Sequence, residues 1–243
     1  MKKYWPIAIL LIAVVFVIGL VVVMRGRGGN EVVDEDENVA EVPVDQRPYT
    51  YLVPREDGHW MDLTVENIDV QGAAMIEYEF TYTTSDGRTQ GTGGSKPFKA
   101  GDDFTSEILI GTTSSGNYYY DEGVEVGELK LKFRNDSGKL IGKLSTPWNL
   151  KFEPDSLEFG GLTYTPDDSA DLYFVTMSTF GLPLEAPGKV LSGPVGVFAS
   201  DDAEGKVAMS GGSLYLWDGE AWQSIESGSS VTPGVFIGVT LSE

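Results

Sequence analysis

The sequence predicts an all-β protein, with two tandem β-sandwich domains of immunoglobulin-like type after one amino-terminal transmembrane helix. Three observations support this fold class: an uncharged apolar run near the start, segments that alternate apolar and polar residues, and frequent turns rich in Gly, Asp, Asn and Ser. Alternation with a period of two is typical of a strand with one buried face. No segment after residue 24 shows a sustained helical period.

The first element expected is a transmembrane helix, because residues 4–24 contain no charge. A helix of these 21 residues would span about 31 Å at ~1.5 Å per residue, which matches a hydrocarbon core of ~30 Å. A cleaved signal peptide, the alternative, has an apolar segment of roughly 7 to 15 residues followed by a small-x-small site. The nearest such triplet here, residues 26–28, has Arg27 at its centre. We therefore expect the helix to be retained, with Tyr4 and Trp5 at the membrane interface.

The orientation of this helix follows from the positive charges at its two ends. Lys2, Lys3 and the α-amino group precede it, and Arg25 and Arg27 follow it. The more positive end stays in the cytoplasm. Residues 1–24 are thus predicted to form a cytoplasmic stub and a single membrane span, which places the bulk of the chain outside the cell membrane. The chain contains no cysteine, so this part cannot rely on disulfides.

Acidic residues dominate the chain after the anchor. Residues 25–47 combine carboxylates, glycine and proline without apolar periodicity, which predicts a flexible acidic stalk. Beyond the anchor, 15 basic residues face 37 acidic ones, and residues 155–243 hold 13 acidic residues but only Lys189 and Lys206 as basic ones. Nucleic acid is excluded as a partner because affinity for phosphates comes from Lys and Arg. The acidity also fits a surface that is charged for solubility, or a surface that binds cations.

Residues 48–154 are predicted to form the first sandwich. The clearest strand has Ile76, Tyr78, Phe80 and Tyr82 on one face, and a turn at residues 85–88 follows it. Further strands are expected at residues 63–68, 104–110, 129–134, 139–144 and 148–152. Six or seven short strands in about 100 residues suit one β-sandwich.

Residues 155–243 are predicted to form the second sandwich, after a break at Pro154-Asp155. Seven strands are expected, at residues 157–163, 172–179, 195–199, 206–209, 214–217, 222–225 and 235–241. Their alternation is sparser than in the first block, so a small barrel is the alternative fold.

The sequence lacks the residues that most known types of catalytic site require. The chain has one histidine, His59, and no cysteine, which excludes Cys/His nucleophilic sites and multi-histidine metal clusters. No Gly-x-Ser-x-Gly elbow and no phosphate-binding glycine loop occur. The carboxylates of Glu77 and Glu79 could in principle serve a hydrolase, but alternation explains them as the wet face of a strand. We expect no catalytic residue and no cofactor.

Two binding features remain. Asp201, Asp202 and Glu204 place three carboxylates in one loop, where calcium could bind although the spacing of an EF-hand is absent. The string LYLWDGEAWQSI predicts a hairpin in which Trp217 and Trp222 meet across an Asp-Gly turn.

A third binding feature is the run Tyr118, Tyr119 and Tyr120, which must send rings to both faces of a strand. These aromatic rings fit either core positions or a platform that stacks against sugars or a protein partner.

Two stretches resemble known proteins. The string W-D-G-x-x-W at residues 217–222 is similar to hairpins found in surface and virion-fibre proteins. The anchor, the acidic stalk and the run YDEGVEVGELKLKFRNDSGKLIGKLSTPW resemble membrane-anchored β-sandwich surface proteins of bacteria, to which no activity is assigned. The resemblance implies an exposed β architecture and carries over no catalytic residue.

These observations predict a non-catalytic, membrane-anchored extracytoplasmic protein for binding, adhesion or envelope structure. Its expected partners are the membrane, through the amino-terminal helix, and a cell-surface protein or glycan. The alternative is a membrane-anchored, carboxylate-dependent hydrolase of surface polymers, which would require a carboxylate pair in a cleft.

Overall fold

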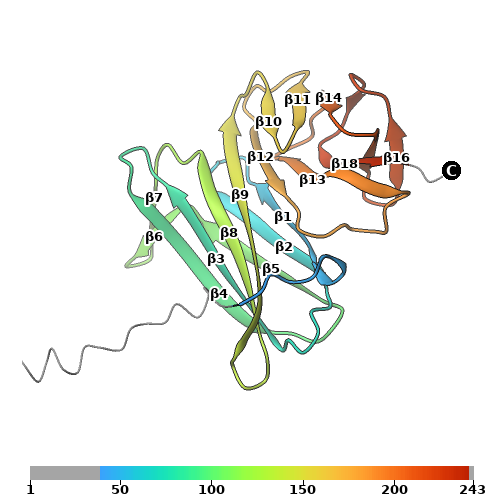
Figure 1. Ribbon diagram of the computed structural model, residues 1–243. Coiled ribbons are helices and arrows are strands. Elements are labelled where there is room, and N and C mark those ends of the chain that lie inside the picture. The colour runs from blue at the N-terminus through green and yellow to red at the C-terminus, as the bar shows by residue number, and fades with distance from the viewer. Residues whose placement is uncertain (1–38, 241–243) are drawn as a thin grey trace, which may run out of the picture. The chain divides into compact units, whose positions relative to one another are not determined.

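The computed structural model describes residues 39–240. The predicted transmembrane helix, and the predicted stalk as far as residue 38, lie outside the described residues. Within residues 39–240, no helix combines the length and the apolar character needed to cross a bilayer. This part of the chain is all-β with β-sandwich character, as predicted (Figure 1). Its one helical element is a single 3-10 turn, η1 (Val44–Gln46).

The largest sheet of this part of the chain has nine strands and draws on both predicted blocks. In spatial order its strands are β16 (Trp222–Ile225), β15 (Ser213–Trp217), β18 (Gly234–Thr240), β13 (Lys189–Ala199), β12 (Tyr173–Ser178), β9 (Leu140–Phe152), β8 (Val126–Arg134), β3 (Met75–Thr83) and β4 (Thr89–Pro97). Each neighbouring pair is antiparallel.

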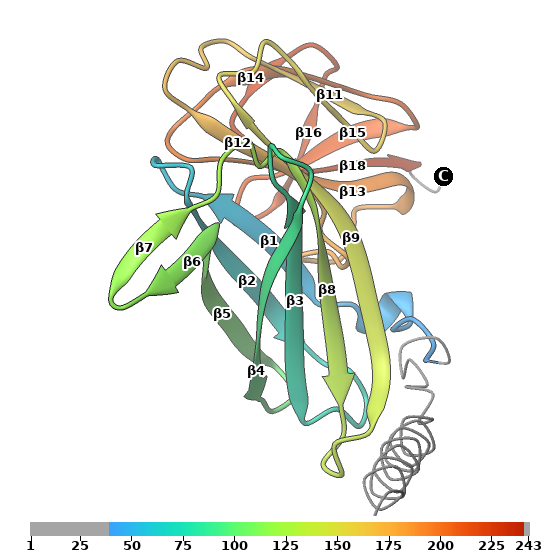
Figure 2. The same ribbon diagram turned by 90° about the vertical axis from the view of Figure 1, so that its left-hand side faces the viewer.

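Three smaller sheets accompany it (Figure 2). The first is β1 (Tyr49–Pro54), β2 (Trp60–Ile68) and β5 (Asp102–Leu109). The second is β10 (Leu157–Phe159), β11 (Leu162–Pro166), β14 (Gly205–Met209) and β17 (Ser230–Val231). The third is a hairpin of β6 (Gly111–Ser114) and β7 (Asn117–Tyr120), which projects from the body in Figure 2.

Two apolar cores form where the first two of these smaller sheets face the nine-stranded sheet. In the first core, Phe80 of β3 stacks on Trp148 of β9, with ring centroids 4.7 Å apart and both side chains fully buried. In the second core, Tyr164 of β11 packs against Phe174 and Phe236, and its hydroxyl donates to the Val231 carbonyl. Alternating apolar residues thus produce two apolar cores that share one sheet.

Strand β12 contributes to both cores. Phe174 belongs to the second core, whereas Val175 and Met177 belong to the first, and all three are fully buried. Successive side chains of a strand point to opposite faces, so the two cores meet this strand from opposite sides. β12 also pairs with β9, so the sheet is continuous across Pro154-Asp155. Independent folding of the two blocks stays a prediction.

The last part of the predicted stalk differs from expectation, because residues 39–47 are folded against the sheet. Val42 is 1% exposed and its N–H donates to the Lys143 carbonyl of β9 at 3.1 Å. The Arg47 guanidinium donates to the Val42 carbonyl at 3.0 Å and pairs with Glu41 at 2.9 Å. Burial of one valine and the Arg47 hydrogen bonds therefore hold a segment whose composition alone predicts mobility.

Candidate functional site

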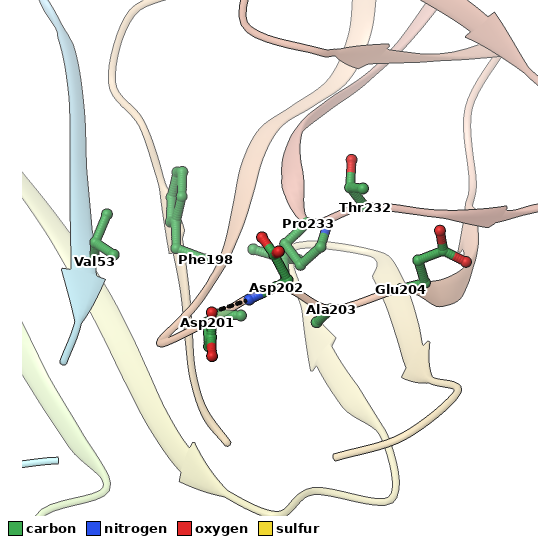
Figure 3. Close-up of a pocket in the computed structure, with 10 residues that line it drawn as sticks. Val53, Phe198, Asp201, Asp202, Ala203, Glu204, Thr232 and Pro233 are labelled. Atoms are coloured by element: carbon green, nitrogen blue, oxygen red, sulfur yellow. Dashed lines mark hydrogen bonds between the residues drawn. The ribbon is translucent and has the colours of Figure 1, made fainter. Parts of the chain in front are cut away.

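A concave surface of the described residues lies between β1 and the end of β13. It consists of two adjoining pockets, of about 630 and 410 Å³, that share Phe198, Thr232 and Pro233. The first is also lined by Val53, Val197, Ala199, Asp201, Asp202, Ala203 and Glu204. The second is also lined by Tyr49, Tyr51, Glu66, Pro183, Trp217, Asp218, Gly219, Gly234 and Val235. We refer to these residues together as the junction groove; Figure 3 shows the first of its two pockets.

The floor of the groove is apolar and aromatic. Phe198, from the end of β13, stacks on Tyr51 of β1 with centroids 5.4 Å apart and an interplanar angle of 25°. Tyr51 in turn lies against Tyr49, with centroids 4.9 Å apart. Val53 and Pro233 extend this surface. Clefts with aromatic walls and a few polar groups are the usual binding sites of proteins.

The Tyr51 hydroxyl is fixed by a carboxylate of the neighbouring strand. It donates to Glu66 Oε1 at 3.0 Å. Burial and the hydrogen bond to Glu66 raise the pKa of Tyr51, so the phenol stays neutral near pH 7 and remains a donor. Oε1 of the Glu66 carboxylate therefore already accepts a hydrogen bond from within the protein.

The loop that carries the three predicted calcium ligands is held at both ends. At one end, the Ser200 N–H donates to the Tyr173 carbonyl at 2.9 Å and the Tyr173 N–H donates to Ser200 Oγ at 3.0 Å. At the other end, the Asp167 N–H donates to the Glu204 carbonyl at 2.9 Å. These backbone contacts place the loop along the rim of the groove.

The predicted ligands Asp201, Asp202 and Glu204 all line the first pocket and are exposed. The Asp202 N–H donates to Asp201 Oδ1 at 2.8 Å, as drawn in Figure 3. Among the described residues, no three His, Cys, Asp or Glu side chains are grouped closely enough to hold a metal ion. Calcium binding by this loop stays a prediction without geometric support.

The tryptophan hairpin forms as predicted. Trp217 and Trp222 are directly opposed in the β15–β16 pair, with ring centroids 5.6 Å apart at 60°. Trp217 lines the groove. The Trp222 indole N–H donates to the Leu184 carbonyl at 3.2 Å, which ties this ring to the loop between β12 and β13. Both rings are partly buried, so the pair combines a packing role with a partly accessible surface.

The turn between the two tryptophans is organised by Asp218. Its Oδ1 accepts from the N–H groups of Glu220 and Ala221, at 2.9 and 2.8 Å, and its Oδ2 accepts from the Gln223 amide at 3.0 Å. The backbone N–H groups, with the Gln223 amide, lower the pKa of Asp218, so its carboxylate stays ionised at pH 7. A fixed negative charge therefore lies at this end of the groove.

The rim of the groove is acidic throughout. Its five carboxylates come from three separate segments: Glu66, then Asp201 with Asp202 and Glu204, and then Asp218. No Lys, Arg or His lines either pocket, and within residues 39–240 none of the five carboxylates forms an ion pair. Carboxylates arranged around a concave apolar surface concentrate negative potential there.

The three predicted tyrosines lie elsewhere, on strand β7 of the projecting hairpin. Tyr118, Tyr119 and Tyr120 are 54%, 57% and 43% exposed. The Tyr120 ring stacks on His59 at 4.0 Å, and Tyr118 meets Trp60 edge-on at 5.4 Å. They form an exposed aromatic patch that shares no lining residue with the junction groove.

The carboxylate pair considered for a hydrolase is engaged in ion pairs on the sheet surface. Glu77 Oε1 lies 3.0 Å from Arg134 Nε, and Glu79 Oε1 lies 2.6 Å from Lys132 Nζ. Neither glutamate lines either pocket of the junction groove. These contacts match the interpretation of the pair as the solvated face of a strand.

Comparison with family models, with curated proteins and with solved structures finds no match to this chain. Sequence reasoning found the acidic loop and Trp217, and the structure brings them to one groove. It missed the floor for two reasons. Phe198 lies in a predicted strand, where an aromatic residue is expected in the core, and no strand was predicted around Tyr51, which lies in β1.

Proposed function

We propose that this protein is a non-catalytic, membrane-anchored extracytoplasmic protein with two sandwich domains, and that it acts by binding or adhesion at the cell envelope through the junction groove. The observation that carries the proposal is the groove itself. Its stacked aromatic floor lies next to Trp217 and to five carboxylates, none of which forms an ion pair within residues 39–240, so the groove offers a ligand both aromatic surface and negative charge. Aromatic side chains in such positions contribute much of the energy of protein interfaces.

The absence of a nucleophile and base constellation in the sequence supports a binding role over the hydrolase alternative. Of the carboxylates considered, Glu77 and Glu79 are neutralised by Arg134 and Lys132. A general acid of a glycosidase instead needs a raised pKa beside a second carboxylate in a cleft. Incubation of the purified protein with surface polysaccharides should release no reducing ends, and release that disappears in Asp201→Asn or Asp202→Asn, whose carboxylates line the groove, would favour the hydrolase.

Retention of the purified full-length protein on isolated cell envelope tests the proposal. We expect Trp217→Ala to weaken retention about 30-fold, which corresponds to a hot-spot loss of about 2 kcal/mol. Leu191→Ala is the matched control, since Leu191 is 51% exposed and lines neither pocket of the groove. Melting temperatures are measured on both variants, and unchanged retention of Trp217→Ala at full folding would refute the groove as the contact site.

The anchor is tested separately by intact mass. If residues 4–24 stay in the mature protein, material extracted from membranes has the mass of the whole chain, 26.3 kDa. A mature chain that begins near Gly28 would show that the amino-terminal segment is removed.

A further inference from the structure

The junction groove holds negative charge that nothing in the described part of the chain balances. Elsewhere, carboxylates such as Glu79 and Asp62 are neutralised by basic side chains. In the groove, five carboxylates from three segments share one rim without Lys, Arg or His among the lining residues. An anionic ligand would be repelled there, and a neutral one would leave the charges uncompensated. Charge complementarity therefore selects a cationic occupant.

The floor adds a second requirement. Phe198, Tyr51 and Trp217 present aromatic surface, and Val53 and Pro233 add aliphatic surface. Aromatic faces attract Lys and Arg side chains through cation–π contacts and also accept apolar groups. A ligand that combines cationic and apolar groups would use both the rim and the floor.

The extent of the groove gives the third requirement. Two adjoining pockets of about 630 and 410 Å³ exceed what one small amine fills. An extended peptide alternates its side chains every ~3.3 Å, so it can place basic groups at the rim and apolar groups on the floor.

We propose that the junction groove binds an extended peptide segment that carries Lys or Arg side chains alternating with apolar ones. The cationic groups lie against Asp201, Asp202 and Glu204 at one end and against Asp218 at the other. The apolar groups lie over Phe198 and Pro233. This inference rests on the proposed binding function of the groove and names its ligand class.

The test measures binding of a fluorescent hexapeptide of alternating lysine and leucine to the purified full-length protein in neutral detergent, by anisotropy. The groove variant is Asp201→Asn, Asp202→Asn and Glu204→Gln together, in which each amide retains an acceptor oxygen. The matched control is Glu56→Gln, Glu158→Gln and Glu226→Gln, which changes net charge equally at exposed positions outside the groove. We expect the groove variant to bind at least tenfold more weakly and the control to stay within twofold of the wild type.

Further arms separate the sources of binding. A hexapeptide of alternating glutamate and leucine should not bind, and spermine should compete at least tenfold less well than the lysine peptide. The single variant Asp202→Lys should also weaken binding, and it guards against misfolding of the triple variant because the structure gives the Asp202 carboxylate no hydrogen bond within residues 39–240.

Four results would overturn the inference: no binding of the lysine peptide, equal binding of the glutamate peptide, equal competition by spermine, or an equal loss in the control variant. Envelope retention of Trp217→Ala, measured on the same preparations, distinguishes this failure from failure of the proposed function. Lost retention together with absent peptide binding would keep the groove as a contact site and reject its cationic ligand.

Discussion

The blocks of residues 48–154 and 155–243 differ in the groups that stabilise their carboxylates. The first block holds ten basic and 17 acidic residues, the second two and 13. Ion pairs of the first block include Glu77 with Arg134 at 3.0 Å, Glu79 with Lys132 at 2.6 Å and Asp62 with Arg55 at 2.6 Å. In the second block, Asp218 is instead satisfied by backbone N–H groups and an amide. Neutral N–H donors stabilise the Asp218 carboxylate without cancelling its negative charge. The electrostatic potential of the second block can therefore still attract a cationic ligand.

The largest expected effect comes from separating the two blocks. Fragment 39–154 lacks β12 and with it Val175 and Met177, which the first core buries completely. Burial of two such side chains contributes about 3 to 6 kcal/mol, a large share of a typical domain stability. We expect fragment 39–178, which restores β12, to show sharper amide spectra and a higher melting temperature than fragment 39–154. Dispersed spectra from 39–154 and 155–243 alone would instead establish two independent domains.

Single charge substitutions should change stability in opposite directions in the two blocks. Glu79→Gln removes an ion-pair partner of Lys132, whose side chain is 12% exposed, and should lower the free energy of unfolding by about 0.5 kcal/mol. Asp202→Asn relieves repulsion among rim carboxylates and should raise that free energy by up to about 0.5 kcal/mol. Urea denaturation of both variants checks the two signs, and the same sign for both would refute the contrast.

Salt sharpens the same contrast. The formal net charge is −20, and raising NaCl from 10 to 150 mM shortens the Debye length from about 30 to about 8 Å. Screening should therefore raise the melting temperature of the wild type. The variant Asp201→Asn, Asp202→Asn, Glu204→Gln should gain less, because part of the repulsion is already gone. If salt raised the melting temperatures of the wild type and of the triple variant equally, the repulsion that salt screens would lie outside the groove.

The smallest expected effect is the acid dependence that Asp218 contributes. Its pKa in the folded state lies below its usual value, so its contribution to stability is present above about pH 4, the unfolded pKa, and is lost as pH falls through the folded pKa. Between pH 6 and pH 3 the melting temperature of Asp218→Asn should therefore fall less than that of the wild type. Superimposable profiles would show that the turn stabilises the fold without this charge.

Much of the strand structure could be predicted because alternation is local. The segment around Phe80 and the hairpin around Trp217 carry their own period and turn, and both form as expected. Strand β4 was missed because the run TQGTGGSKP has no apolar face. Its glycines nevertheless serve packing, since a Cβ at Gly94 would lie 2.8 Å from the Tyr78 ring.

The parts that could not be predicted depend on contacts between distant segments. The pairing of β12 with β9 joins the two blocks into one sheet, and no local pattern encodes that choice. The candidate site follows the same rule. Asp202 and Trp217 were identified as separate features, but only the fold brings both to Phe198.

The folded segment of residues 39–47 has a mechanical consequence. A pull on the chain from its amino-terminal side first loads the hydrogen bond from Val42 to Lys143 and the Arg47 contacts, because these precede every bond of β1 along the chain. Few bonds resist at this point, whereas β9 behind them is paired along its length with β8. The segment would therefore yield before the sheet does, and its nine residues would then span at most about 30 Å at ~3.3 to 3.6 Å per residue. The contacts of residues 39–47 are thus the first among the described residues to break when the chain is pulled from its amino-terminal side.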